Sequence, residues 1–253
     1  MKVEGISAIV TGGASGLGAA TARLLSKLGA AVAVFDVNRS QGEALAQEVS
    51  GFFYCVDVTS QEGVIEALQS VNRDCGVARV LVNCAGIGPP AKAVDRDGQA
   101  QDLALFKKII DVNLVGTFNT SSKFAAHAMT LAPLGEERGL IINTASVAAF
   151  EGQIGQAAYA ASKGGIASLT LPLAREFARS AIRVVTIAPG LFLTPLLASL
   201  PEPAQRSLGQ QVPFPNRLGA PEEYAQFVHS VIVNPMLNGE TVRLDGAIRM
   251  APK

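Results

Sequence analysis

Tyr159 and Lys163 stand four residues apart in a segment of helical periodicity, and Ser146 precedes them at the end of a strand-like run. On a helix, residues at this spacing share one face. Tyrosine alone is a poor base at neutral pH, but a neighbouring ammonium would stabilise the phenolate and lower its pKa. Most Tyr-x-x-x-Lys pairs are surface features. Here Ser146, which could hydrogen-bond a substrate oxygen, favours a site that exchanges a proton with an alcohol hydroxyl.

A glycine-rich turn, Thr11-Gly12-Gly13-Ala14-Ser15-Gly16-Leu17-Gly18, joins the first strand-like run to a helical one. Glycines there let the backbone turn tightly and let a pyrophosphate approach the free N–H groups of the helix N-terminus. A tight strand-to-helix connection without any ligand is the alternative. The position after the first strand favours a dinucleotide site, and the Lys163 ammonium could donate hydrogen bonds to the ribose hydroxyls of such a ligand.

The identity of the dinucleotide depends on Asp36, which ends the second strand-like run. A carboxylate at that position accepts hydrogen bonds from the adenosine ribose hydroxyls and repels a 2′-phosphate. Arg39 is close in sequence and favours NADP, because an arginine can pair with that 2′-phosphate. We expect the cofactor to be NAD.

The elements that must position these residues alternate between short apolar runs and longer helical segments. The predicted strands are Ile6–Val10, Ala31–Phe35, Phe52–Val56, Val80–Val82, Leu140–Asn143, Arg183–Ile187 and Thr241–Leu244. Predicted helices include Leu17–Leu28, Gly42–Val49, Val64–Val71, Phe106–Met129 and Tyr159–Ala178. Alternation of this kind indicates an α/β fold with a doubly wound, seven-stranded parallel sheet and helices on both faces.

We expect residues 1–253 to form a single domain, because no linker, repeat or low-complexity tract interrupts the alternation. Two segments depart from it, Ala91–Leu103 and the proline-rich Thr194–Gly219, and both follow the carboxyl end of a strand. A long insertion at that edge of a parallel sheet is often functional. We expect a substrate lid at about 191–219. Its apolar side chains either cover the pocket or pack on their own domain: Leu191, Phe192, Leu196, Leu197 and Leu200.

Composition excludes several classes of protein. The chain has 21 Lys+Arg and 21 Asp+Glu, a net charge of zero and a pI of 6.7, so no basic excess suggests nucleic acid or an anionic membrane as a partner. Three scattered cysteines and two histidines have neither disulfide nor zinc-ligand spacing, and no metal is expected. No leader or membrane span is evident. We expect a cytoplasmic protein, or one of the mitochondrial matrix if its source is an animal.

The spacing Thr-Gly-x-x-x-Gly-x-Gly, with the motifs that follow it in order, resembles the short-chain dehydrogenase/reductase family over essentially the full chain. Those motifs are Asp57-Val58, Asn83-Cys84-Ala85-Gly86, Asn113, Ser146, Tyr159 with Lys163, and Pro189-Gly190 with Thr194. Where the family usually reads Asn-Asn-Ala-Gly, Cys84 replaces the second Asn. The resemblance implies a Rossmann fold and a nicotinamide cofactor.

The resemblance also assigns roles to residues. Those implied to be catalytic are Ser146, Tyr159, Lys163 and Asn113, the last through the family's proton relay. Cofactor contacts are implied for Gly12, Ser15, Gly16, Leu17, Gly18, Asp36, Asp57, Val58, Asn83, Cys84, Ala85, Gly86, Tyr159, Lys163, Pro189, Gly190, Phe192 and Thr194. Substrate contacts are implied for Ser146, Gln153, Gln156 and Tyr159.

Four stretches are similar to one branch of the family, the type 2 3-hydroxyacyl-CoA dehydrogenases, which include enzymes called 17β-hydroxysteroid dehydrogenase type 10. They are Asn143–Tyr159, Ala188–Leu197, Val212–Gly219 and Arg243–Met250. The branch uses NAD to oxidise L-3-hydroxyacyl-CoA to the 3-oxo form, accepts some steroids, and forms homotetramers. Cys84 is normal in it.

Two other functions remain open. A reductase of 3-oxoacyl groups on acyl carrier protein normally prefers NADPH and needs a basic docking patch, so Asp36 and the zero net charge disfavour it. A non-catalytic dinucleotide-binding subunit would keep the fold without the chemistry, and the intact set of Ser146, Tyr159, Lys163 and Asn113 disfavours that.

Overall fold

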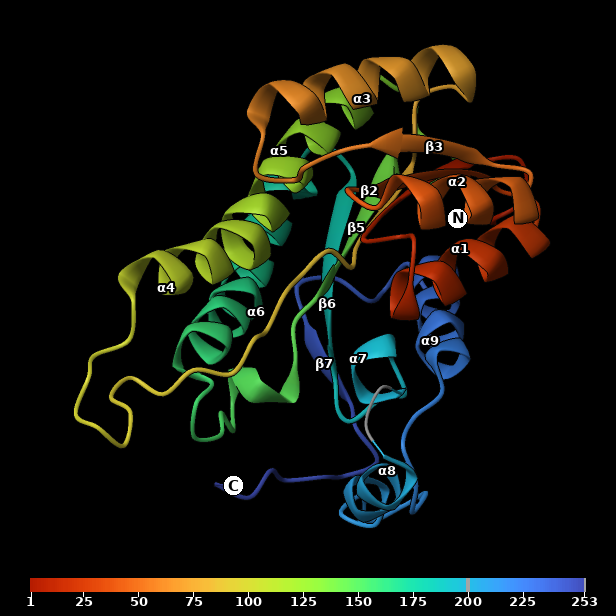
Figure 1. Cartoon of the computed structure of the whole chain (residues 1–253). Helices are drawn as coiled ribbons and strands as arrows, with labels where there is room; N and C mark the ends of the chain where they lie inside the picture. The colour runs from red at the N-terminus through yellow and green to blue at the C-terminus, as the bar shows by residue number, and fades with distance from the viewer. Residues whose placement is uncertain (199–200, 253) are drawn as a thin grey trace.

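The computed structural model describes residues 1–198 and 201–252, and contains one parallel sheet in the order β3-β2-β1-β4-β5-β6-β7 (Figure 1). The strands are β1 Ser7–Thr11, β2 Ala31–Asp36, β3 Phe52–Cys55, β4 Val80–Asn83, β5 Gly139–Thr144, β6 Ile182–Pro189 and β7 Thr241–Leu244. Every bound lies within two residues of its prediction, which confirms the fold class. The strand order reverses between β1 and β4, where an open parallel sheet forms its ligand crevice.

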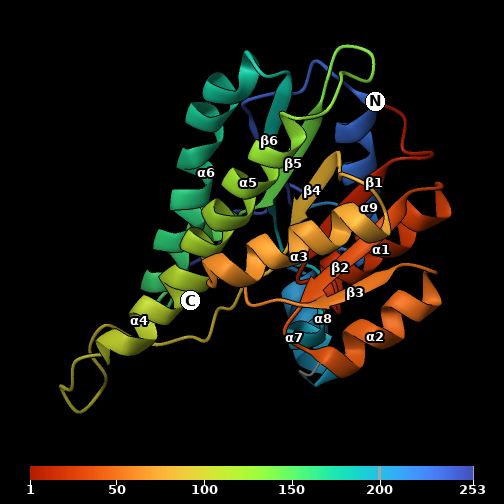
Figure 2. The ribbon, with the colours of Figure 1, turned by 90° about the horizontal axis from the view of Figure 1, so that it is seen from above.

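Helices cover both faces of the sheet, with α1, α2 and α9 on one face and α3, α5 and α6 on the other (Figure 2). Their bounds are α1 Gly16–Lys27, α2 Arg39–Glu48, α3 Gln61–Asp74, α4 Leu103–Ile110, α5 Gly116–Ala128, α6 Ala157–Ala178, α7 Pro195–Ala198, α8 Glu202–Gly209 and α9 Pro221–Val233.

The core is divided between these two faces because successive side chains of a strand point to opposite sides. Ile9, Leu81 and Ile141 face α3, α5 and α6, whereas Val10 and Val82 face α1, α2 and α9. All five are essentially fully buried. The central strands therefore read as continuous apolar runs, and the polar residues at their carboxyl ends are set rigidly along one edge.

The helix predicted over Phe106–Met129 is interrupted, and the prediction of one regular helix was wrong there. A π-helical turn, η1 Asp111–Val115, separates α4 from α5 and contains Asn113. The carbonyl oxygen of Asn113 accepts a hydrogen bond from Thr117 Oγ1 at 2.6 Å within the wider turn. Such turns inside α-helices are frequent at functional sites.

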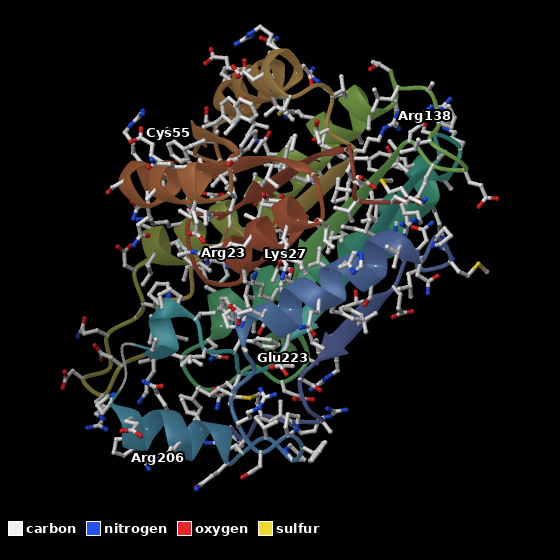
Figure 3. All side chains as sticks on the ribbon, turned by 90° about the vertical axis from the view of Figure 1, so that its right-hand side faces the viewer. Arg23, Lys27, Cys55, Arg138, Arg206 and Glu223 are labelled. Carbon is white, nitrogen blue, oxygen red and sulfur yellow. The ribbon has the colours of Figure 1, made fainter. Side chains whose placement is uncertain are left out.

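The segment 191–219 contains two short helices, α7 and α8, beside the carboxyl ends of β6 and β7 (Figure 1). Figure 3 shows Glu223 at the start of α9, above α8, which carries Arg206. Glu223 forms a two-point ion pair with Arg217, with N–O distances of 2.7 and 2.8 Å, which fixes the end of the segment to α9. Leu200 lies outside the described residues, as do Ser199 and Lys253.

No helix within 1–198 or 201–252 combines the length and the apolar character needed to cross a membrane. In the same ranges, no group of three or more His, Cys, Asp and Glu side chains is arranged to hold a metal ion.

Candidate active site

A cleft of about 800 Å³ lies along the carboxyl ends of the strands, within the size range of cofactor sites. Nearly all of the predicted site residues line it: Gly12, Ser15, Gly16, Leu17, Gly18, Asp36, Asp57, Val58, Cys84, Ala85, Gly86, Ser146, Gln153, Gln156, Tyr159, Lys163, Pro189, Gly190, Phe192 and Thr194. Asn83 and Asn113 do not. These residues follow the carboxyl ends of the strands β1 to β6. The cleft therefore depends on nearly the whole sheet.

The glycine-rich turn forms one end of the cleft, and its geometry fits a dinucleotide phosphate. Gly12 has φ +61°, and a Cβ there would lie 2.6 Å from the Ala85 nitrogen. Ser15 precedes α1 without making a side-chain capping hydrogen bond, so the first N–H groups of the helix face the cleft unclaimed by their cap. Such a helix N-terminus attracts anions.

Asp36 lies beside this turn and is held by two backbone amides. Its Oδ2 accepts from the Ala14 N–H at 3.0 Å and its Oδ1 from the Asn38 N–H at 2.9 Å. Arg39, the residue that weakened the expectation of NAD, forms an exposed ion pair with Glu43 at 3.1 Å and does not line the cleft. The carboxylate therefore faces the cofactor end of the cleft without an arginine beside it.

Asn83, predicted to contact the cofactor, is instead buried behind the cleft. Its Nδ2 donates to Asn143 Oδ1 at 2.9 Å and to Ser121 Oγ at 3.0 Å, while its Oδ1 accepts from Thr120 Oγ1 at 2.8 Å. These bonds join β4 to β5 and to α5. The side chain sets the position of the strand end, and the neighbouring Cys84, Ala85 and Gly86 form the wall.

Ser146, Tyr159 and Lys163 meet at the other end of the cleft. Ser146 follows β5, and its Oγ accepts from the Ala148 N–H at 3.1 Å. Tyr159 and Lys163 lie in the first two turns of α6, with Lys163 Nζ 5.7 Å from the centre of the tyrosine ring. Lys163 Nζ also donates to the Thr144 carbonyl oxygen at 2.7 Å. A lysine, a tyrosine and a serine are thus brought together around one part of the cleft.

Burial controls the protonation of this pair. It raises the pKa of Tyr159, and Ser146 opposes that shift through its hydroxyl. Desolvation lowers the pKa of Lys163 to about 8. The pKa of Tyr159 is therefore not lowered as its spacing to Lys163 led us to expect, because burial outweighs the effects that favour the phenolate.

Asn113 holds the backbone beside the cleft and does not line it. Its Oδ1 accepts from the Ile87 N–H and its Nδ2 donates to the Ile87 carbonyl oxygen, both at 2.8 Å. Nδ2 also donates to Ser162 Oγ at 2.9 Å. The π-helical turn brings this side chain against the loop that follows β4. In this structure the Asn113 side chain positions the backbone at Ile87, and the catalytic role implied by the resemblance stays a prediction.

The expected substrate residues hold the loop between Ser146 and Tyr159. Gln153 Nε2 donates to the Ala251 carbonyl oxygen at 3.0 Å, and Gln156 Oε1 accepts from the Gln153 N–H at 3.1 Å. Both still line the cleft.

The expected lid residues divide between the cleft and the core. Leu191 and Leu197 line the cleft. Phe192 lines it too, but its ring is buried in the core. The ring packs closely on Gly219, where an added Cβ would lie 2.8 Å from the Phe192 Cε1 atom. The side chain of Leu196 and the whole of Leu200 lie outside the described residues.

Sequence reasoning missed two groups that support this site. Tyr224, on α9, is completely buried, and its hydroxyl lies 2.7 Å from Thr144 Oγ1 and 3.8 Å from Cys84 Sγ. Thr144 in turn supplies the carbonyl oxygen that accepts from Lys163. No local motif marks Tyr224 or Thr144. Tyr224 lies on α9, which follows the long segment 191–219, so its contact with Thr144 joins distant parts of the sequence. Met250, near the C-terminus, also lines the cleft.

Comparison with known proteins agrees with this geometry. The model of the family described as short chain dehydrogenase matches residues 7–205. The chain is 53% identical over 255 residues to the 3-hydroxyacyl-CoA dehydrogenase type-2 of Homo sapiens, covering 99% of this chain and 98% of the relative. Identity to the protein of the same name from Drosophila melanogaster is 47%, with 99% and 100% covered. The crystal structure of 3-hydroxyacyl-CoA dehydrogenase type-2 from Mycobacterium avium superposes with a TM-score of 0.94 at 43% identity, covering 98% of both chains.

Proposed function

The chain belongs to the short chain dehydrogenase family, and we propose that it is an NAD-dependent 3-hydroxyacyl-CoA dehydrogenase. The observation that carries the proposal is the junction of Ser146, Tyr159 and Lys163 at one end of a cleft whose other end is formed by the glycine-rich turn and Asp36. Full-length identity of 53% to a relative with that name supports the substrate class.

Bound NAD would supply the nicotinamide carbon that accepts the hydride. The chain's own residues accept the proton of the substrate hydroxyl and stabilise the charge that forms. Tyr159 takes the proton of the substrate hydroxyl, Ser146 hydrogen-bonds the same oxygen, and Lys163 keeps a positive charge near the phenolate as it forms. Since burial lowers the pKa of Lys163 to about 8, this ammonium loses its charge more readily than a surface lysine does. For hydroxysteroids, which we propose as additional substrates, the same three residues would serve.

The choice of NAD over NADP rests on Asp36. Its two oxygens are oriented by the Ala14 and Asn38 amides, so the carboxylate is fixed where it would accept from ribose hydroxyls and repel a 2′-phosphate. The exposed ion pair between Arg39 and Glu43 supports this choice, because the arginine already has a carboxylate partner.

Steady-state kinetics test the proposal. Purified protein is assayed for reduction of NAD and NADP with short- and medium-chain L-3-hydroxyacyl-CoA, a hydroxysteroid and a simple secondary alcohol. It is assayed in the reverse direction with a 3-oxoacyl group on acyl carrier protein. We expect the highest kcat/KM with a 3-hydroxyacyl-CoA and NAD. Preference for the carrier-protein substrate with NADPH, or binding of NAD without turnover of any substrate, contradicts the proposal.

We further propose a homotetramer, as in the branch that the sequence resembles. Helices α5 and α6 lie side by side on one face of the sheet (Figure 2). Large apolar side chains are exposed along them and the adjoining π-helical turn: Val115, Phe118 and Leu171. Such a surface suits a contact across a two-fold axis. Light scattering at micromolar concentration checks this, and a monomer would contradict it.

The cellular compartment is also part of the proposal. Cys55, Cys75 and Cys84 are all free thiols, which suits a reducing compartment such as the cytoplasm, or the mitochondrial matrix in an animal. Localisation of the tagged full-length protein by microscopy tests this expectation.

A further inference from the structure

The segment after β7, residues 246–252, contributes to the cleft; we call it the tail. In Figure 1 it runs along the lower edge of the molecule, from the neighbourhood of α8 toward the loop that precedes α6. Met250 in this tail lines the cleft together with Gln153, Gln156 and Leu197. Its side chain is half-buried. A residue close to the C-terminus therefore belongs to the wall of the candidate active site.

The loop between the two catalytic residues Ser146 and Tyr159 holds the tail by three hydrogen bonds. The Met250 N–H donates to Glu151 Oε2, Gln153 Nε2 donates to the Ala251 carbonyl oxygen, and the Ile154 N–H donates to the Pro252 carbonyl oxygen, each at 3.0 Å. These bonds place Met250 at the substrate end of the cleft, far along the sheet edge from Asp36.

An ion cluster fixes the base of the tail. Arg243, on β7, pairs with Glu151 and with Asp245, each at 2.7 Å, and donates to the Ile248 carbonyl oxygen at 2.8 Å. The hydrogen bonds from Arg243 hold the pKa of Glu151 below its usual value. The side chains of Arg243 and Glu151 are only about one-fifth exposed, so solvent screens this pair less than an ordinary surface pair.

The tail also contacts the segment 191–219. The Phe214 N–H donates to the Gly246 carbonyl oxygen at 3.2 Å, and Gly246 has φ +59° where it passes Val212. Ile248 is completely buried. The tail is therefore attached on one side to the loop 151–156 and on the other to the expected lid, and it closes the gap between them.

We propose that Met250 is a specificity-determining residue that limits the length of the substrate's acyl chain. The inference rests on the proposed function and deepens it. Methionine is unbranched and apolar, so it fills the end of a pocket without requiring a hydrogen-bond partner. The anchors on both sides of the tail keep its backbone in place, and the side chain alone then sets how far a chain can extend.

Two substitutions of opposite size test this. Met250→Ala removes the end of the wall and Met250→Phe extends it. The readout is the ratio of kcat/KM for an eight-carbon to that for a four-carbon L-3-hydroxyacyl-CoA. Since one methylene in an apolar pocket changes kcat/KM by roughly 10-fold or more, we expect a rise of about 10-fold for Met250→Ala and a fall of similar size for Met250→Phe. KM for NAD should not change.

The matched control is Met236→Ala, because Met236 is 91% exposed in the turn after α9 and does not line the cleft. It should leave the ratio unchanged. Ratios that stay within about twofold of wild type in both Met250 variants overturn the proposal, as does a shift in the same direction for both. Melting temperatures are measured for all three, so that a fold defect is recognised.

The ratio of kcat/KM for a long to that for a short substrate is also measured with secondary alcohols. A wild-type enzyme that oxidises these alcohols but no acyl-CoA contradicts the proposed function. In that case, opposite shifts of the ratio in the two Met250 variants would still support the role of Met250, and unchanged ratios would refute it.

Glu151→Gln tests the anchoring separately, because glutamine keeps the size of the side chain and removes its charge. We expect faster amide hydrogen exchange at Met250 and weaker discrimination between the two chain lengths. Unchanged exchange at residues 248–252 would contradict the anchoring.

Discussion

The two ends of the cleft are built in different ways. At the cofactor end, strand ends and a tight glycine turn form the wall, and Gly12 leaves no room for a side chain against Ala85. At the substrate end, the wall consists of the loop 151–156, the segment 191–219 and the tail, joined by bonds such as that between Gln153 and Ala251. The first end is fixed by the core of the sheet, whereas the second depends on contacts between segments far apart in sequence.

This difference explains how one fold combines a constant cofactor with variable substrates. A change in a loop or in the tail leaves the strand ends in place, so the substrate can change while binding of the nicotinamide dinucleotide persists. Ser146, Tyr159 and Lys163 lie where the two ends meet, and each substitution below is expected to affect one end, the other, or their junction.

The largest effect is expected at the junction. Tyr159→Phe removes the ionisable hydroxyl and keeps the ring that packs on Gly88, so kcat should fall by roughly 10²–10⁴-fold while NAD still binds. Initial rates and NAD titration measure the two quantities. If the variant kept more than about a tenth of the activity, Tyr159 would not be the base.

The pH dependence at the junction follows from the same residue. Oxidation needs the phenolate, and burial raises the pKa of Tyr159, so the rate of oxidation should increase as pH rises above neutrality. Reduction needs the phenol and should lose rate over the same range. A rate of oxidation that is flat or falls between about pH 7 and about pH 8, before the Lys163 ammonium loses its charge, would refute this assignment.

The next effect is confined to the cofactor end. Asp36→Ala should raise KM for NAD by about 10-fold, because hydrogen bonds to a charged acceptor are lost, and should improve NADP relative to NAD. Arg39→Ala is the matched control and should change neither, since Arg39 pairs with Glu43 on the surface. Comparable use of both cofactors by the wild-type enzyme would contradict the role of Asp36.

A smaller effect is expected at the substrate end. Leu197 lines the cleft, so Leu197→Ser should raise KM for a medium-chain 3-hydroxyacyl-CoA by about 10-fold and KM for a short one much less. Leu193→Ser is the control within the same segment, because Leu193 is exposed and does not line the cleft. An equal rise for both chain lengths, or a large drop in melting temperature, would mean that Leu197 is structural.

The last prediction concerns stability and not catalysis. The pKa of Lys163 is about 8 in the folded protein and about 10.4 in an unfolded chain, so the unfolded state binds more protons between those values. The free energy of unfolding should therefore rise with pH across this window, by about 1–3 kcal/mol. Below the window, the full loss of stability caused by burying the charged Lys163 should remain. Urea unfolding of wild type and Lys163→Met checks this, and identical pH slopes would contradict it.

The contrast between the two ends also explains how far sequence reasoning reached. The strands, the glycine turn, Asp36 and the set of Ser146, Tyr159 and Lys163 follow from local patterns, and the structure brings them into one cleft. A local pattern could not show that Asn83 turns away into a buried network, because its partners lie on β5 and α5.

Residues at the substrate end were harder to predict for the same reason. Gln153 was expected to contact substrate and lines the cleft, but no local pattern predicts that its amide also holds the tail nearly a hundred residues later in the chain. Met250 attracted no prediction because its role depends on Arg243 and Glu151 fixing the tail. The π-helical turn that interrupts the long helix carries Asn113, whose hydrogen bonds to Ile87 join residues that helical periodicity does not connect.

The most direct test of the proposed function traces the hydride from substrate to cofactor with a deuterium label. Purified enzyme is incubated with NAD and an L-3-hydroxyacyl-CoA that carries deuterium on C3, and the reduced cofactor is examined by mass spectrometry. If the chain is an NAD-dependent 3-hydroxyacyl-CoA dehydrogenase, each NADH formed carries one deuterium, the 3-oxoacyl-CoA carries none at C3, and Tyr159→Phe forms almost none of either product. Reduced cofactor without deuterium, or no reduction of NAD by any 3-hydroxyacyl-CoA, would contradict the proposed function.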